Sequence, residues 1–569
     1  MEPAKRLRLV GEGCAMLLNT KEVRALGVAV LMGALPLPQL HAEESAPVPD
    51  TAGEQGAATQ EPADAADERR IDILEFQVDG NTVLSALDIE AAIEPFTGPQ
   101  RAVSDVEKAR GALEAAYRKQ GYETVAVEIP AQDVRSGIVH LKVGELRVGQ
   151  LRVTNSRYYT PERIKQRMPS LAEGQVPRYD EVSREIAKIN NARDRTITPT
   201  LRAGTAPGTV DVDLEVEDRA PVHASIELND RYSTRTSRLR MAATLSYANL
   251  FQLDHSLTIQ AQTSPQNTDE SKVFSASYLA PLAGTDFSVV MYGVHSDSSV
   301  AAVGGIDVLG NGDIVGVRGV LALPGGTGYS QQLLAGADYK HFKEDLVLGG
   351  DNATTPITYV PLTLSYSFTQ AGKSGMTDAA VALTWGTRGF GSGNDEFRQK
   401  RYNARANFFS VRPDLKRTQI LPHDFRATLG VSGQLADQPL ISNEGFSIGG
   451  ADSVRGYEES QVIGDYGMQS SLQIDTPSLH GLLGPAFNEW RLFAFADWGR
   501  VWLKDPLPDI DGKVTRSTAL SSVGIGSLLR AFDRANASVY LAAPLTHKDT
   551  LDLDIDDSIR VGFRVWAEF

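Results

Sequence analysis

The sequence predicts a mainly β fold, in which a 16-stranded antiparallel transmembrane β-barrel at 220–569 follows two small α/β modules at 71–144 and 145–219. Three observations lead to this prediction. Short segments with alternating apolar and polar residues fill the C-terminal part, and one order of strands and helices occurs twice before it. The chain also ends in an alternating segment with a terminal phenylalanine. Strands that cross a bilayer and helices that belong to soluble modules account for these patterns.

Residues 1–42 have the pattern of a secretory signal peptide. Lys21 and Arg24 precede an apolar run, Ala25–Leu37, and the sequence LHA at the end of the segment fits a cleavage site. The alternative is a membrane anchor, but the run is shorter than the roughly 18 to 20 residues that a spanning helix needs. Residues 43–70 are rich in Ala, Glu, Pro and Asp, which predicts a flexible linker.

The two modules share one expected order of elements, namely strand, helix, helix, strand, strand. In the first module these are a strand at 71–81, helices at 87–96 and 103–120, and strands at 124–129 and 137–143. In the second they are a strand at 145–155, a helix that Thr160 and Pro161 open, a helix at 179–190, and strands at 196–203 and 209–218. A spacing of roughly 75 residues relates the two sets, so two copies of one α/β module are the simplest interpretation.

The helix expected at 103–120 has a single apolar face. Its apolar residues recur at spacings of three and four: Val106, Ala109, Leu113, Ala116 and Tyr117. Gly121 follows directly, as glycine does at helix C-termini. We expect this face to pack against the strands of the first module.

The alternating segments after residue 220 fit either a soluble β-sandwich or a membrane barrel with a polar lumen. Clear examples lie at 239–247, 361–368 and 401–408. Segments of about ten residues suit a tilted strand that spans a bilayer, whereas a sandwich uses shorter and fewer strands. The barrel is therefore favoured. Four arginines fall on the polar side of these segments and are expected to face the lumen: Arg240, Arg405, Arg560 and Arg564.

The last segment alternates up to the end of the chain. Its apolar side is Ile559, Val561, Phe563, Val565, Ala567 and Phe569. Outer-membrane barrels end in such a strand, and we interpret Phe563, Val565, Ala567 and Phe569 as a C-terminal barrel-assembly signal; the alternative is an ordinary edge strand. Closure of the sheet is expected, because an open edge in lipid would leave backbone groups unpaired.

The sequence FSIGGADSVRGY, residues 446–457, lies in a long connection at 436–466 between two expected strands. Connections of about 30 residues are usually functional or disordered. Arg455 stands between Val454 and Gly456 and is followed by Tyr457, which suggests a defined tip.

Asp497 belongs to the strand FAFADWGRVW and shares its lumen-facing side with Phe493, Phe495 and Gly499. If the long connection folds into the lumen, Arg455 can pair with Asp497, and a bidentate contact of this kind is among the stronger polar interactions. The alternative is a solvated arginine outside the barrel and an aspartate bonded to neighbouring strands.

The composition excludes several functions. The net charge of −16 argues against nucleic-acid binding. Cys14 is the only cysteine and lies in the predicted signal peptide, which excludes disulfides and thiolate chemistry in the mature protein. The nine histidines lack ligand spacing, so no metal site is expected. Ala371–Ser374 imitates a phosphate-binding loop, but Ser367 replaces its first glycine. We therefore expect no enzyme activity and no cofactor.

VRGY at 454–457 together with F-x-D-x-G at 495–499 resembles the signature pair of polypeptide-transporting barrels that carry POTRA domains. The two α/β modules resemble POTRA domains. Two such domains before a 16-stranded barrel resemble the two-partner secretion (type Vb) transporters of the haemolysin and filamentous haemagglutinin type, over residues 71–569. The resemblance implies a loop–barrel lock between Arg455 and Asp497. Five further motif residues would support this lock: Val454, Gly456, Tyr457, Phe495 and Gly499.

The resemblance also implies a function. The protein would be a monomer in the outer membrane of a Gram-negative bacterium, with its POTRA domains in the periplasm. There it would capture an unfolded exoprotein, such as a large β-helical adhesin or haemolysin, and pass it through the barrel. Further expected partners are outer-membrane lipid, the barrel-assembly machinery and periplasmic chaperones. Family members tend to have an N-terminal plug helix, and residues 43–70 show no amphipathic helix. The alternatives are a barrel-assembly insertase and a plain diffusion porin.

Overall fold

The computed structural model describes residues 70–233, 236–298, 300–303, 306–326, 328–343, 345–348, 351–508, 512–546 and 558–569. These residues form two compact units, one that ends at Ala220 and one that begins at Pro221. The predicted signal peptide and all of the predicted linker except Arg70, which begins the first strand, lie outside the described residues. Within the described part, none of the helices has the length and apolar character needed to cross a bilayer.

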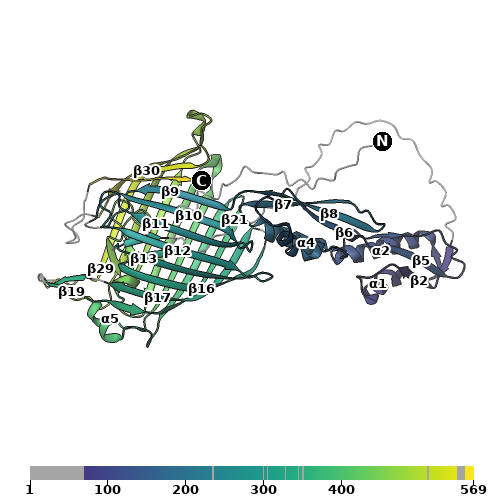
Figure 1. The fold of residues 1–569 in the computed structure, drawn as a ribbon, viewed down its shortest axis with the longest axis horizontal. Helices are drawn as coiled ribbons and strands as arrows, with labels where there is room; N and C mark the ends of the chain where they lie inside the picture. Colours follow the sequence, from purple (N-terminus) through teal and green to yellow (C-terminus); the bar gives the residue numbers. More distant parts are fainter. Residues whose placement is uncertain are drawn as a thin grey trace, which may run out of the picture. The chain divides into compact units, whose positions relative to one another are not determined.

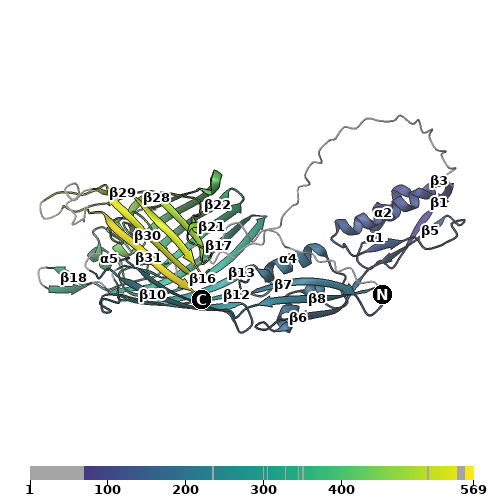
Figure 2. The same cartoon turned by 90° about the horizontal axis from the view of Figure 1, so that it is seen from above.

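The first unit begins with a module of a three-stranded sheet, a two-stranded sheet and two α-helices (Figure 2). Its elements are β1 Arg70–Ile73, β2 Glu75–Asp79, α1 Ala86–Ile93, η2 Glu94–Phe96, β3 Gly98–Ala102, α2 Val103–Lys119, β4 Ala126–Glu128 and β5 Ile138–Gly144. The sheet order is β2-β5-β4, and β2 is parallel to β5. The strand predicted at 71–81 is instead divided at Leu74, because β1 pairs with β3 and β2 pairs with β5.

The predicted apolar face of α2 forms much of the first module's core. Val106, Ala109, Leu113 and Tyr117 are buried, and Ala116 packs against them. Gly121 has φ +89°, the left-handed conformation that ends a helix and that glycine adopts without strain.

The second module repeats this topology. Its elements are β6 Arg147–Thr154, α3 Pro161–Gln166, η3 Pro169–Leu171, α4 Tyr179–Asn190, β7 Arg195–Ala203 and β8 Thr209–Asp218. The sheet order is β6-β8-β7, with β6 parallel and β7 antiparallel to β8. In each three-stranded sheet, the strand that comes first in the chain is therefore the parallel neighbour of the one that comes last.

Hydrogen bonds join the two modules at Glu145. Its carboxylate accepts hydrogen bonds from the backbone amides of Thr82 (2.7 Å) and Val83 (3.2 Å) and is almost fully buried. The amide of Tyr179 donates to the carbonyl of Gly121 at 2.8 Å. The side chain of Val176, from the second module, packs into the first module's core. These contacts hold the modules to each other, which the sequence pattern did not indicate.

The second unit is a closed antiparallel barrel of 16 strands, as predicted (Figure 1). In the described residues these are β9 Val222–Asn229, β10 Arg240–Leu250, β11 His255–Thr263, β12 Lys272–Pro281, β13 Phe287–Ser296, β16 Asn311–Gly326, β17 Tyr329–Lys343, β20 Ile357–Tyr359 with β21 Pro361–Gly372, β22 Gly375–Gly386, β23 Phe409–Ile420, β24 Arg426–Ala436, β27 Tyr466–Asp475, β28 Phe487–Trp502, β29 Ser517–Ala531, β30 Ala535–Pro544 and β31 Arg560–Glu568. The segments β20 and β21 both pair with β17 and make one strand, interrupted where Pro361 has no N–H to donate.

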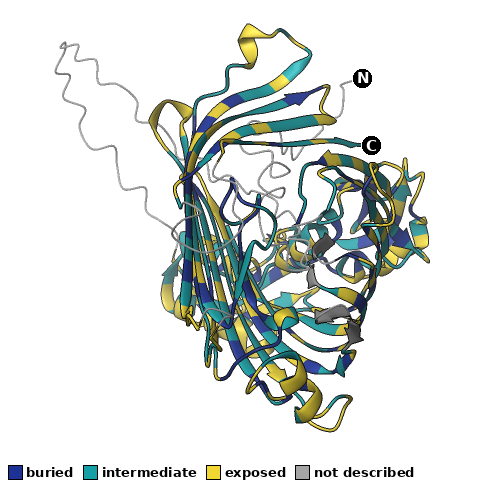
Figure 3. Cartoon of the chain, turned by 90° about the vertical axis from the view of Figure 1, so that its left-hand side faces the viewer, coloured by how far each residue is buried: buried dark blue, intermediate teal, exposed yellow. Residues whose placement is uncertain are grey.

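Alternation along the strands separates an outer from an inner face (Figure 3). On the outer face, Leu245, Val315 and Ile525 are more than half exposed, whereas their neighbours in sequence are less so. Connections are short at one end, such as 373–374, and long at the other, where hairpins β14 Val300–Val303 with β15 Ile306–Leu309 and β18 Asp345–Leu348 with β19 Asp351–Thr354 occur. This asymmetry is typical of outer-membrane barrels, whose extracellular loops are the longer ones.

The C-terminal strand closes the barrel. β31 pairs with β30 on one side and with β9 on the other, and the amide of Phe569 donates to the carbonyl of Ala224 at 2.8 Å. Val561, Val565 and Phe569 are exposed on the outer face, on the side that the sequence assigned to lipid.

The strand predicted at 401–408 is wrong. A short helix, α5 Asn394–Lys400, precedes an irregular segment there. Ala404, Ala406 and Phe408 are buried in a cluster with Phe397 and Tyr359, so their spacing of two reflects packing against this cluster and not a lipid-facing strand. Within the same segment, the guanidinium of Arg405 donates to Gln438 Oε1 at 2.7 Å instead of lining a strand of the lumen.

The joint at Glu145 is testable. In Glu145→Ala, the amides of Thr82 and Val83 lose their hydrogen bonds to a buried carboxylate, at a cost of about 1.5 to 3 kcal/mol. We expect these amides to exchange about ten-fold faster with deuterium in the full-length protein. Glu107→Ala, at a carboxylate that is largely exposed on α2, is the matched control and should leave both rates unchanged. If the amides of Thr82 and Val83 exchange at the same rates in both variants, Glu145 does not stabilise the contact between the modules.

Candidate functional site

The connection between β24 and β27 folds back into the barrel. It contains η5 Ser442–Glu444 and a two-stranded hairpin, β25 Phe446–Ile448 with β26 Val462–Gly464. The hairpin carries a tip at 449–461. Gly449 and Gly450 start this tip with φ +104° and +106°, a conformation that strongly favours glycine. We call residues 449–461 the loop tip.

Arg455 of the loop tip contacts Asp497 on β28 through two parallel hydrogen bonds. Arg455 Nε lies 2.7 Å from Asp497 Oδ2, and Arg455 Nη2 lies 2.9 Å from Oδ1. The backbone amide of Arg455 also donates to Oδ2, at 3.1 Å. The Asp497 side chain is fully buried and that of Arg455 is 7% exposed. The structure thus brings Arg455 and Asp497 together with the loop inside the lumen, which was one of the two predicted alternatives.

The remaining contacts of the guanidinium come from the wall beneath it. Nη1 donates to Gln473 Oε1 at 2.8 Å and Nη2 donates to Ser471 Oγ at 3.1 Å, both on β27. Ser471 lies opposite Asp497 in the strand register and donates to its Oδ1 at 2.6 Å. The guanidinium carbon lies 3.5 Å from the ring centre of Phe495. Every guanidinium nitrogen is therefore bonded, as a buried charge requires.

The motif residues around the arginine fit the tip to the wall. Val454 is fully buried in an apolar cluster with Ile448 and Val501. Gly499 lies beneath this cluster, where an added Cβ would be 3.1 Å from a methyl of Val454. At Gly456, with φ +96°, an added Cβ would be 3.1 Å from the Cβ of Ala542. Both glycines thus allow a close approach of loop and wall.

Tyr457 makes polar contacts with β29 and with the segment that follows β30. Its hydroxyl donates to the carbonyl of Ser521 at 2.8 Å and accepts from the amide of Thr546 at 3.2 Å. The arginine and the tyrosine of the motif therefore bind different strands, β28 and β29.

Two phenylalanines of β28 lie against glycines of β29. In the strand register Phe495 faces Gly524 and Phe493 faces Gly526. A Cβ at either glycine would come within 2.3 Å of the ring it faces. The glycines make room for the rings to lie along the wall beneath Arg455. The sequence analysis did not identify these glycines, since their register relative to β28 was not known.

The base of the loop is held by two carboxylates that the sequence analysis also missed. Asp465 accepts hydrogen bonds from the amides of Leu440 (2.7 Å) and Lys504 (2.6 Å). Glu444 accepts from Lys340 Nζ and from the Tyr359 hydroxyl, both at 2.6 Å. No sequence signal could have found them, because their partners are distant in the chain.

Three of the four arginines that were predicted to face the lumen contact polar or aromatic side chains. Arg240 donates to Thr236 Oγ1 at 2.7 Å, and Arg564 donates to Glu227 Oε2 at 2.7 Å. Arg560 lies over the ring of Tyr232, at 4.2 Å. These three are on the inner face, in contrast to Arg405.

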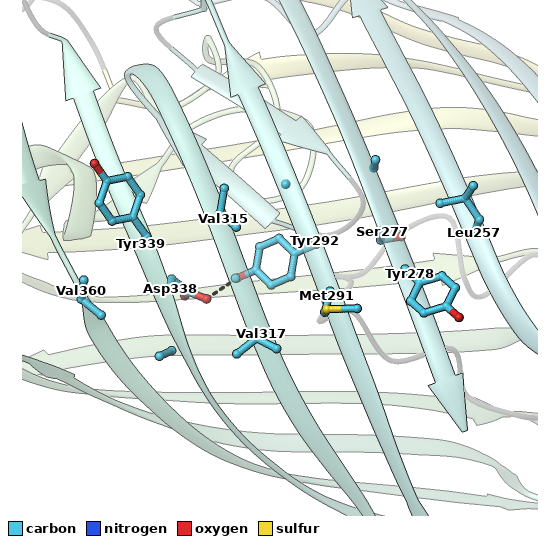
Figure 4. Close-up of a pocket in the computed structure, with 14 residues that line it drawn as sticks. Leu257, Ser277, Tyr278, Met291, Tyr292, Val315, Val317, Asp338, Tyr339 and Val360 are labelled. Atoms are coloured by element: carbon cyan, nitrogen blue, oxygen red, sulfur yellow. Dashed lines mark hydrogen bonds between the residues drawn. The ribbon is translucent and has the colours of Figure 1, made fainter. Parts of the chain in front are cut away.

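A hollow of about 570 Å³ lies over β11–β17 and is mostly apolar (Figure 4). Its polar residues Tyr292 and Asp338 bond to each other at 2.6 Å, and Arg318 donates to Asp338 at 2.6 Å. Among the described residues, no group of three or more His, Cys, Asp or Glu side chains is arranged to hold a metal ion. The loop tip, with its bidentate ion pair and its polar contacts to the barrel wall, is therefore the candidate functional site.

Comparisons with known proteins show which family and which fold this chain resembles. The model of the haemolysin secretion/activation protein family ShlB/FhaC/HecB matches residues 208–318 and 342–527, and that of the ShlB-type POTRA domain matches residues 71–145. The heme/hemopexin transporter protein HuxB of Haemophilus influenzae is 22% identical over 487 residues, which cover 80% of each protein.

Solved structures share the fold. CdiB from Escherichia coli has a TM-score of 0.61 at 19% identity, over 90% of this chain and 93% of its own. CdiB from Acinetobacter baumannii has a TM-score of 0.56 at 15% identity, over 88% and 90%. BamA from Haemophilus ducreyi lacking POTRA domains 1-3 has a TM-score of 0.53 at 14% identity, over 88% and 100%.

Removal of both partners of the buried pair should cost less than the sum of the two single removals. Asp497→Ala leaves the Arg455 guanidinium buried without its carboxylate, which we expect to cost about 3 to 5 kcal/mol. The double variant Arg455→Ala, Asp497→Ala should lose less than the sum of the two single variants. The midpoint of thermal unfolding in detergent, followed by the gel shift of the folded barrel, measures these losses. Strictly additive losses would show that the two side chains do not stabilise each other.

Proposed function

Because the chain belongs to the ShlB/FhaC/HecB family of haemolysin secretion/activation proteins, we propose that it is an outer-membrane transporter that moves one exoprotein from the periplasm to the cell surface. The loop tip inside the barrel carries this proposal. A loop that is bonded to the inner wall by Arg455 can close the lumen at rest and must shift to admit a polypeptide. The barrel and the family together imply the outer membrane of a Gram-negative bacterium, with the modules in the periplasm.

We further propose that Arg455 and Asp497 act as a loop–barrel lock. Val454, Gly456, Tyr457, Phe495 and Gly499 support it by shape and by hydrogen bonds. A buried ion pair that is fully hydrogen-bonded is costly to separate, yet it re-forms in one geometry. The pair therefore suits a loop that leaves its seat during transport and returns to it afterwards. We also propose that Phe563, Val565, Ala567 and Phe569 form a C-terminal barrel-assembly signal, because they alternate along the strand that closes the barrel.

Part of the inner wall is suited to an unfolded chain. Between β10 and β11, Ser246 and Thr258 face each other and bond at 3.0 Å. On β21, Thr369 bonds to Asp378 on β22 at 2.8 Å. Short hydroxyl side chains that already have partners offer a wet surface with few strong attachment points, which a moving polypeptide can pass.

The modules are proposed to capture the exoprotein by strand addition at β7. This strand is an outer strand of its sheet and has nine residues. Its first half is covered, because the Asn190 side chain bonds both backbone groups of Ile197 (2.7 and 3.0 Å) and Pro199 has no N–H. Backbone N–H and C=O groups alternate in direction along a strand, so those of Leu201 point the same way as those of Ile197, away from β8. Leu201 is 53% exposed.

The second module is proposed to be a second POTRA domain, since its sheet repeats the topology of the domain at 71–145. An insertase function is the main alternative. The likeness to BamA, at 14% identity, concerns the fold alone, whereas the family match includes the loop and most of the barrel. A diffusion porin would not need the modules.

Deletion of the gene separates these functions. We expect one exoprotein to disappear from the cell surface and medium while other outer-membrane barrels stay at normal levels, as judged by quantitative proteomics of both fractions. A general loss of barrels would contradict the transporter and favour an insertase. Unchanged levels of all secreted proteins would favour a porin.

The open end of β7 gives a second test. Leu201→Pro removes an outward N–H at this end without removing a bond to β8, so it should lower secretion of the exoprotein by about ten-fold. Leu201→Val keeps the N–H and is the control. The folded barrel should remain heat-modifiable in both variants. Normal secretion by Leu201→Pro would contradict capture at this edge.

A further inference from the structure

The loop tip has a second charged contact on another part of the barrel wall. The carboxylate of Asp452 accepts two hydrogen bonds from Arg231, at 2.6 Å from Nη1 and 2.8 Å from Nη2. The amide of Glu459, also in the loop tip, donates to the carbonyl of Tyr232 at 3.0 Å. Arg231 and Tyr232 lie two and three residues after the end of β9. The loop tip is therefore fixed both to β28, through Arg455, and to the end of β9.

The same end of β9 completes the seam that closes the barrel. Paired residues of β9 and β31 run only from Ser225 to Asn229 on β9, a shorter ladder than that of β30 with β31. Beyond Asn229, Asp230 continues the seam, because its Oδ1 accepts from the amide of Phe563 at 2.9 Å and its own amide donates to the carbonyl of Phe563 at 3.3 Å.

Tyr232 adds a contact across this seam. Its ring lies 4.2 Å from the guanidinium carbon of Arg560 on β31. Residues 230–232 are thus held on one side by β31 and on the other side by the loop tip. If the loop tip leaves, this short segment loses the contacts of Asp452 and Glu459. It keeps those to β31, the hydrogen bond from the Arg231 amide to Asn229 Oδ1, and the contact of the Tyr232 ring with Arg238.

We infer that Arg231 and Asp452 are positioning residues that couple the place of the loop tip to the closure of the β9–β31 seam. A bidentate pair fixes both distance and direction, so the segment 230–232 follows the loop tip while the pair is intact and loses this restraint when the pair breaks. When the loop tip withdraws, the β9–β31 seam should therefore loosen at the end next to residues 230–232. By the same linkage, opening of that end weakens the hold on the loop. This inference concerns the barrel alone and does not rest on the proposed transport of an exoprotein.

Hydrogen exchange on the full-length protein in detergent tests the coupling. Asp452→Asn removes the charge and keeps the size of the side chain. We expect exchange to rise by about ten-fold at the amide of Glu459, in the loop tip, and at that of Asp230, in the seam. A rise confined to Glu459, or a rise at neither amide, would overturn the inference.

Two further experiments test the coupling: an exchange of the two charges, and a control substitution in another ion pair of the barrel. Arg231→Asp combined with Asp452→Arg restores an ion pair in the opposite sense and should return both amides to within about two-fold of the original rates, whereas Arg231→Asp alone should not. Failure of the double variant to restore protection, with the barrel still heat-modifiable, would also overturn the inference. Asp338→Asn breaks a buried pair with Arg318 across β16 and β17 and should change neither amide.

Discussion

The requirement that every backbone group in lipid has a hydrogen-bond partner determines the architecture of the second unit. In a bilayer the strands can meet it only as a closed sheet, and β31 meets β9 to close it. Closure creates an interior, and the alternation of side chains then decides what faces it. The outer face must be apolar, whereas the inner face is free to carry charges such as that of Asp497. The buried contact with Arg455 is possible only because the sheet first provides a protected interior.

Much of this could be predicted from the sequence, because strands have a period of two. That period assigned Asp497 to the lumen and placed Phe569 at the end of a closing strand. It failed at Ala404, Ala406 and Phe408, where packing under α5 imitates a strand. Alternation reports that every second residue is buried, and it does not report whether lipid or another part of the protein lies on the other side.

Contacts between irregular segments could not be predicted. Arg231 and Asp452 are 221 positions apart and both lie outside periodic elements. The cover of β7 by Asn190 depends on how α4 packs against its sheet, and the joint at Glu145 depends on how two modules meet. Such contacts arise from the fold as a whole. The motif VRGY was recognisable because four adjacent residues perform one task, whereas these pairs leave only single polar residues in the sequence.

The glycines opposite Phe493 and Phe495 have a consequence for how the barrel can vary. Gly524 touches neither ion of the pair, yet a methyl group there would press on the Phe495 ring, on which the Arg455 guanidinium rests. A smaller aromatic would not by itself make room for a larger residue, because the added Cβ would also lie 2.3 Å from the backbone carbonyl oxygen of Leu541. A neutral position that contacts neither ion is therefore restricted to glycine by the neighbouring strand's backbone as well as by the aromatic ring.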